Sequence, residues 1–154
     1  MCPSKWSRGV TCKRRAKSRT LKRGLTTKVN VISSSIDTAV AVSLSPGNAH
    51  DAPEGREIIK EVHGNGKPLV MDRAYEDEKT RSVAEKHNFI PVVPPKKNRK
   101  KPWEYDKELY KKRNEIERFF RCLQEYRRVF TRYEKLDVMY LGVILFAMIV
   151  EVVM

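Results

Sequence analysis

The regular hydrophobic pattern of the chain begins with two short alternating stretches. Residues 27–34 carry apolar side chains at Val29 and Val31 between polar neighbours, and residues 39–44 alternate less cleanly. Alternation with a period of two is typical of a strand that buries one face. The pattern therefore predicts a β-hairpin with its turn at residues 35–38.

The middle of the chain switches between helical and strand patterns. A helix is expected to begin near Asp51, the candidate N-cap, with Pro53 in its first turn, and to run to about Val62. After it, the pattern predicts a buried parallel strand, a helix and a short edge strand, over residues 69–71, 77–87 and 89–93. This order favours an α/β fold in which helices flank a mixed sheet.

Two helices are predicted to end the chain, over residues 106–130 and 135–154. The second is almost continuously apolar from Val138 onward, and Gly142 and Glu151 interrupt it. A membrane-spanning helix needs about 20 apolar residues, and a glutamate inside it is costly in lipid. A buried core helix is therefore expected, and a membrane anchor is the alternative.

The N-terminal residues show neither of these periods. Residues 1–28 contain ten Lys or Arg and no Asp or Glu. We expect a basic, loosely ordered arm over residues 1–26, followed by one domain over residues 27–154. The arm either contacts a nucleic-acid backbone or stays unfolded for want of a partner strand.

Composition narrows the class of protein. The 154 residues have a net charge of +13 with 40% hydrophobic residues, so the chain has a core and favours a polyanion such as nucleic acid as its partner. Ribosomal and membrane-surface proteins share such a charge. The three cysteines have no CxxC spacing, which argues against a disulfide framework and a zinc site and fits a cytoplasmic location.

Two carboxylates stand out because of their surroundings. Asp72 follows the apolar run of residues 69–71, and side chains at the carboxyl end of a parallel strand face the crevice where α/β sheets bind ligands. Glu117 shares a helical stripe with Tyr110 and Arg113, at the margin of the buried face. The simpler alternatives are that Asp72 caps a following helix and that Glu117 only pairs with Arg113.

The sequences of both segments resemble motifs of the DDE transposases of bacterial insertion sequences. The likeness lies in Asp72-Arg73-Ala74-Tyr75 and in the spacing Tyr-x2-Arg-x3-Glu that ends at Glu117. The resemblance implies an RNase H-like fold and DNA transposition by metal-dependent phosphodiester cleavage and strand transfer. It makes Asp72 and Glu117 two of three catalytic acids that hold Mg²⁺ or Mn²⁺. Gln124 stands where the family has a lysine.

The same resemblance implies contacts with DNA, the expected partner. Basic and aromatic residues surround the proposed site, and the expected DNA contacts are Tyr110, Arg113, Lys97, Arg99, Lys100 and Arg121. Trp103 and Tyr105 are candidates to stack on a base of a distorted DNA end. A solvated face with partly buried aromatic residues is the alternative.

The third acid of the family belongs on a first strand, upstream of the hairpin. The first carboxylate in this chain is Asp37, in the predicted turn, so the resemblance implies a partial RNase H-like fold that lacks its first strand. We expect an exposed hairpin edge and little activity from the chain alone. The chain would be truncated or half of a split reading frame, and its protein partner an upstream-frame polypeptide or a second copy. A non-catalytic basic DNA-binding protein is the alternative.

Overall fold

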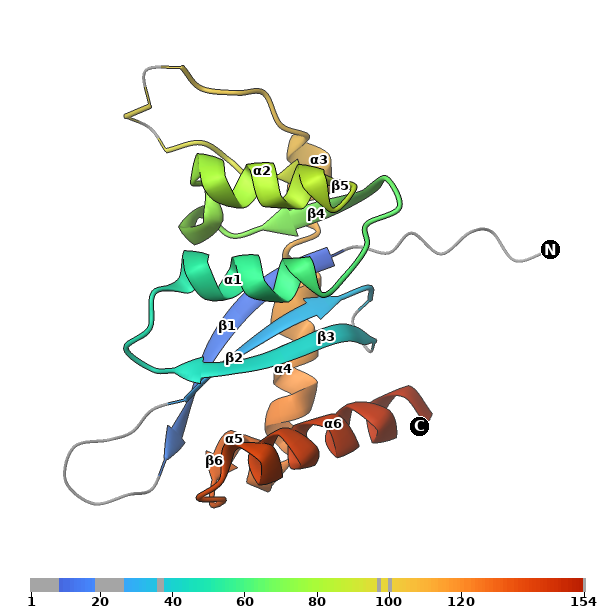
Figure 1. The fold of residues 1–154 in the computed structure, drawn as a ribbon. Coiled ribbons are helices and arrows are strands. Elements are labelled where there is room, and N and C mark those ends of the chain that lie inside the picture. The colour runs from blue at the N-terminus through green and yellow to red at the C-terminus, as the bar shows by residue number, and fades with distance from the viewer. Residues whose placement is uncertain (1–8, 19–26, 36–37, 97, 100, 154) are drawn as a thin grey trace.

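A computed structural model describes residues 9–18, 27–35, 38–96, 98–99 and 101–153. Its described strands form a mixed sheet in the order β3-β2-β1-β4-β5 (Figure 1). These strands are β1 (Gly9–Ser18), β2 (Thr27–Ser33), β3 (Ala39–Pro46), β4 (Lys67–Met71) and β5 (Phe89–Val92). The β1–β2 and β2–β3 pairs are antiparallel, whereas β1–β4 and β4–β5 are parallel. The predicted hairpin, parallel strand and edge strand are thereby confirmed.

Strand β1 differs from the expectation for the N-terminal arm. A loosely ordered segment and a missing first strand were expected, but Gly9–Ser18 pairs with β2 on one side and β4 on the other. The physical reason is that backbone pairing with two neighbours does not require apolar alternation. Neither edge of the hairpin strand β2 is exposed, because β1 and β3 flank it. Residues 1–8 and 19–26 lie outside the described residues.

Helices α1 (Asp51–Lys60) and α2 (Glu78–Lys86) cover one face of the sheet (Figure 1). Their core with the strands contains the apolar side chains Ile32, Ile58, Ile59, Leu69, Met71, Tyr75, Ala84, Phe89 and Val93. Gly55 allows α1 to approach the short 3₁₀ helix η1 (Arg73–Tyr75), because a Cβ there would lie 2.2 Å from Cε1 of Tyr75. This close approach positions the segment that follows β4.

Helix α4 (Asn114–Glu125) crosses the opposite face of the sheet (Figure 1). Its buried residues Ile116, Phe119, Phe120 and Leu123 share a core with Val29, Val31, Val70 and Val92 of the strands. Alternation along β4 explains this division, since Val70 faces α4 whereas its neighbours Leu69 and Met71 face α1 and α2.

The single long helix expected over residues 106–130 is wrong. The structure has α3 (Lys107–Lys111), α4 and α5 (Arg127–Phe130), and the short strand β6 (Thr131–Arg132) pairs with the far end of β1. Tyr126 adopts an extended conformation with ψ of 104°, which ends α4. Phe130, the last residue of the expected helix, lies beyond this break and is 57% exposed.

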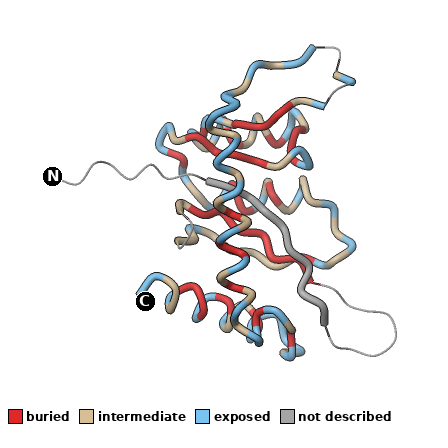
Figure 2. Tube along the Cα trace, turned by 180° about the vertical axis from the view of Figure 1, so that it is seen from behind, coloured by how far each residue is buried: buried red, intermediate tan, exposed pale blue. Residues whose placement is uncertain are grey.

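The described residues bury one side of the last helix, α6 (Asp137–Val153). Its buried residues Tyr140, Ile144, Ala147 and Met148 pack into the core with α4, and Figure 2 shows buried and exposed positions mixed along the helix. The expectation of a buried core helix is therefore wrong for its other side. In the described part of the chain, no helix is both long and apolar enough to cross a membrane.

Candidate active site

Asp72 directly follows β4 and turns the chain into η1. Its backbone is extended, and its Oδ1 accepts a hydrogen bond of 2.7 Å from the backbone N–H of Arg73. The predicted capping role is confirmed. The side chain remains 45% exposed.

Glu117 lies in the first turn of α4 and reaches the same place. Arg113, the residue that precedes α4, lies between the two acids. Its Nη1 is 3.8 Å from Oδ1 of Asp72, and its Nη2 is 3.3 Å from Oε1 of Glu117. The predicted i, i+4 pair exists, and the same guanidinium brings Asp72 and Glu117 together. Glu117 is 42% exposed, which places it at the margin of the buried face, as expected.

Tyr110 belongs to the same cluster although it lies in α3. Burial raises the pKa of the Tyr110 hydroxyl, the Arg113 guanidinium opposes this, and the negative charge of Asp72 adds to it. The ring meets Tyr105 edge to face, with centroids 5.8 Å apart. The break between α3 and α4 therefore does not separate Tyr110 from Arg113 and Asp72.

The fit of this cluster to a divalent metal is incomplete. Carboxylate oxygens are the ligands that Mg²⁺ prefers, but among the described residues no three His, Cys, Asp or Glu side chains gather as a metal would require. Arg113 instead supplies the positive charge between the two acids. The donors have the right chemistry and are too few.

The register of β1 shows which position adjoins Asp72. Thr11 pairs with Met71, so position 12 of β1 lies beside position 72. Position 12 also pairs with Val31, a residue on the face that α4 covers. The residue there is Cys12, and residues 9–18 contain no Asp or Glu.

The basic segment after β5 pairs with Glu76, an acid that the sequence analysis did not single out. Glu76 is buried, and Lys96 and Arg99 approach its carboxylate at 2.9 and 3.8 Å. Burial alone would raise the pKa of Glu76, but hydrogen bonds and charge from Lys96, with the charge of Arg99, hold it below the usual value. Arg99, an expected DNA contact, is thus already engaged. In the sequence, the one local sign that Glu76 is buried is that it directly follows Tyr75.

Trp103, a candidate for base stacking, already has partners within the protein. The indole N–H of Trp103 donates to the carbonyl of Val93 at 2.8 Å. Arg81 and Arg99 lie over the ring, 4.0 and 4.3 Å from its centroid. Trp103 is therefore a structural residue. Of the other expected DNA contacts, Arg121 is exposed on α4, and Lys97 and Lys100 lie outside the described residues.

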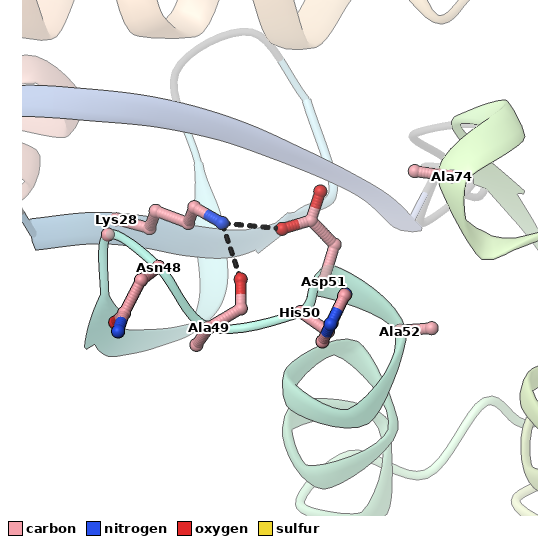
Figure 3. Close-up of a pocket in the computed structure, with 8 residues that line it drawn as sticks. Lys28, Asn48, Ala49, His50, Asp51, Ala52 and Ala74 are labelled. Carbon is pink, nitrogen blue, oxygen red and sulfur yellow. Dashed lines mark hydrogen bonds and ion pairs between the residues drawn. The ribbon is translucent and has the colours of Figure 1, made fainter.

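A polar cavity of about 390 Å³ lies on the α1 side of the sheet (Figure 3). Lys28 crosses it, donating to the carbonyl of Ala49 and to Oδ1 of Asp51 at 2.9 Å. Asp51 was expected to cap α1, but the N-cap is His50, which makes no side-chain capping bond. Asp51 instead pairs with the buried Lys28, a contact between strand and helix that no local pattern reveals.

Comparison with known proteins gives a family match and a relative. Residues 10–150 match the family model described as "Transposase DDE domain", a match that begins within β1. A relative from Brucella ovis, "Putative transposase for insertion sequence element IS6501", is 28% identical over 119 residues. That alignment covers 77% of this chain and 91% of the relative. The family match spans most of the chain, and the chain belongs to the transposase DDE domain family.

Proposed function

We propose that this chain is the catalytic-domain portion of an insertion-sequence transposase with an RNase H-like fold, and that Asp72 and Glu117 are two of its metal-binding acids. The observation that carries the proposal is the meeting of Asp72, from the end of β4, and Glu117, from α4, on Arg113. Two carboxylates from separate rigid elements are what a hydrolytic metal site needs. The substrate class is DNA, at its phosphodiester bonds.

The arrangement also supports a second part of the proposal, that the chain by itself has little or no strand-transfer activity. Position 12 is the place on β1 from which a third carboxylate would reach the same face, and a cysteine stands there. Two acids leave the charge of a divalent ion undercompensated. The positive Arg113 between them opposes binding further.

The experiment is to put the third acid back. Cys12→Asp is expected to raise the affinity for Mn²⁺ at least tenfold over the unchanged chain, measured by calorimetry. Asp72→Asn in the Cys12→Asp background should remove that gain, because it returns the site to two acids. Mg²⁺-dependent nicking of supercoiled DNA by the same variants then tests the reaction class.

The control is Lys13→Asp, which places a carboxylate one position along β1 and changes the net charge by −2, against −1 for Cys12→Asp. Position 13 pairs with Asn30, whose side chain contacts Ser45 away from α4. No gain in affinity is expected there. Equal gains from both variants, with folding verified by circular dichroism, would show that added negative charge alone attracts the ion and would contradict the assignment.

A non-catalytic DNA-binding protein remains the second candidate function, favoured by the net charge of +13. The variant Asp72→Ala in the Cys12→Asp background distinguishes the two candidate functions. Loss of metal-dependent nicking with DNA affinity retained supports the transposase site. Absence of nicking in every variant, with DNA bound by all of them, supports the binding protein.

A further inference from the structure

The outward side of α6 is an apolar surface that no described residue covers. Its residues, here called the outer face, are Val138, Met139, Leu145, Phe146, Ile149 and Val152, each between 44% and 79% exposed, together with Gly142. Six large apolar side chains exposed side by side form a contiguous patch of the kind that marks an interaction site. Water contact with such an area is unfavourable, so a partner is expected.

The charge of the outer face restricts what that partner can be. Residues 138–150 contain no charged side chain. At the two ends of α6, Asp137 pairs with Arg132 at 2.6 Å and Glu151 hydrogen-bonds to Tyr126, so neither charge lies free on the face. In a chain of net charge +13 this is a neutral surface. It offers no positive charge to a phosphate backbone, and it brings no like charges into contact when a second basic copy packs on it.

The spacing and shape of the outer face fit a second copy of the same helix. Positions 138, 142, 145, 149 and 152 follow the alternation of four and three residues that defines a coiled-coil seam. Gly142 is a hole in this seam, because a Cβ there would meet nothing within 4 Å. Phe146, 68% exposed, is a projection one turn further along.

A hole and a projection four residues apart are self-complementary in an antiparallel pair. If Phe146 of one copy enters the space at Gly142 of the other, two-fold symmetry makes the reciprocal contact at once. Antiparallel packing also opposes the dipoles of the two helices.

We propose that two copies of this chain associate through the outer face of α6 as an antiparallel, two-fold symmetric helix pair. The proposal is independent of the metal-site assignment, since the outer face lies on α6 and neither acid does.

The test is sedimentation velocity of the full chain at micromolar concentrations in 1 M salt, where the screening length falls to about 3 Å and charge-driven association is suppressed. A dimer is expected. Phe146→Glu is expected to give monomer, because it brings two charges into the dry seam. Circular dichroism checks that the helix content is unchanged.

Gly142→Leu distinguishes a specific pair from general hydrophobic adhesion. The substitution adds apolar surface and improves the helix, since glycine is the poorest helix former after proline. Non-specific association would therefore strengthen, whereas a pair that uses Gly142 as its hole should weaken at least tenfold. Ile90→Glu, at an exposed apolar residue of β5, is the matched control and should leave the dimer intact.

Three results would overturn the proposal. One is a monomer at every concentration. Another is an unexpected response to the substitutions: Gly142→Leu strengthens the association or leaves it unchanged, or Ile90→Glu abolishes it as fully as Phe146→Glu does. The third is flotation of the chain with neutral phosphatidylcholine vesicles without any dimer, which would assign the outer face to a lipid surface.

Discussion

At the scale of single residues, Arg113 decides the geometry of the proposed site. It bridges Asp72 and Glu117, which the sequence places far apart, and all three side chains are partly exposed. Ion pairs at such exposure contribute well under about 1 kcal/mol to folding. The ion pairs of Arg113 therefore contribute little to the stability of the fold.

Tyr140, unlike the residues of the Arg113 cluster, is buried, and it predicts how the stability of the protein depends on pH. It is fully buried, its hydroxyl donates to the carbonyl of Val129 at 2.9 Å, and burial raises its pKa to about 12, with Arg132 opposing and Glu134 adding to the shift. Because folding raises the pKa of this hydroxyl, its protonated form contributes stability below the unfolded pKa of about 10. That contribution is lost as the pH rises from about 10 toward 12. The free energy of unfolding should therefore fall across this window.

Urea unfolding at pH 7, 10 and 12 measures this effect against Tyr140→Phe. The variant should lose about 1–3 kcal/mol at pH 7, because the Val129 carbonyl loses its partner. It should also show a shallower decline between pH 10 and 12. An equally steep decline in both proteins would assign the pH dependence to other groups.

At the scale of elements, the Lys28–Asp51 pair attaches α1 to β2. The Lys28 side chain is 10% exposed and that of Asp51 is 29% exposed. Lys28→Met should cost roughly 2 kcal/mol of unfolding free energy, less than the 3–5 of a fully buried pair because water reaches Asp51. Thermal and urea denaturation measure the loss.

Lys60→Met is the control for that substitution. Lys60 pairs with Glu57 on the outside of the same helix, with side chains 47% and 69% exposed. Its removal should change stability by less than about 0.5 kcal/mol. Equal losses in the two variants would show that the buried pair does not hold α1.

At the scale of the whole molecule, the net charge of +13 predicts salt-dependent DNA binding. If binding neutralises 6–10 phosphates, raising the salt concentration from 50 to 200 mM should lower the DNA affinity by about 10³–10⁵. Arg121→Gln, at an exposed residue of α4, should weaken binding alike for all sequences and reduce the salt slope by about 1. Fluorescence anisotropy with labelled duplexes measures both.

Lys86, exposed in the last turn of α2, is the comparison residue for that experiment. Lys86→Gln is expected to change affinity and slope less than Arg121→Gln, because it lies across the sheet from α4 (Figure 1). The reverse order would move the DNA surface to the α1 and α2 side of the molecule.

Local sequence patterns determined much of the framework. They predicted the hairpin, the parallel strand before Asp72, the cap that Asp72 makes and the pairing of Arg113 with Glu117. Each of these depends on neighbours within a few residues, or on alternation that burial of one face imposes. The family resemblance from the Asp72 and Glu117 segments was also correct.

Only the tertiary structure decided the features that depend on distant partners. Strand β1 exists because two strands pair with its backbone, Asp51 pairs with a lysine from β2, and two arginines lie over the ring of Trp103. The apolar pattern of α6 predicted burial, but the part of the chain that the structure describes covers one side of it only. Hydrophobicity along a chain states which side chains avoid water, and the packing of the other elements decides which of them can.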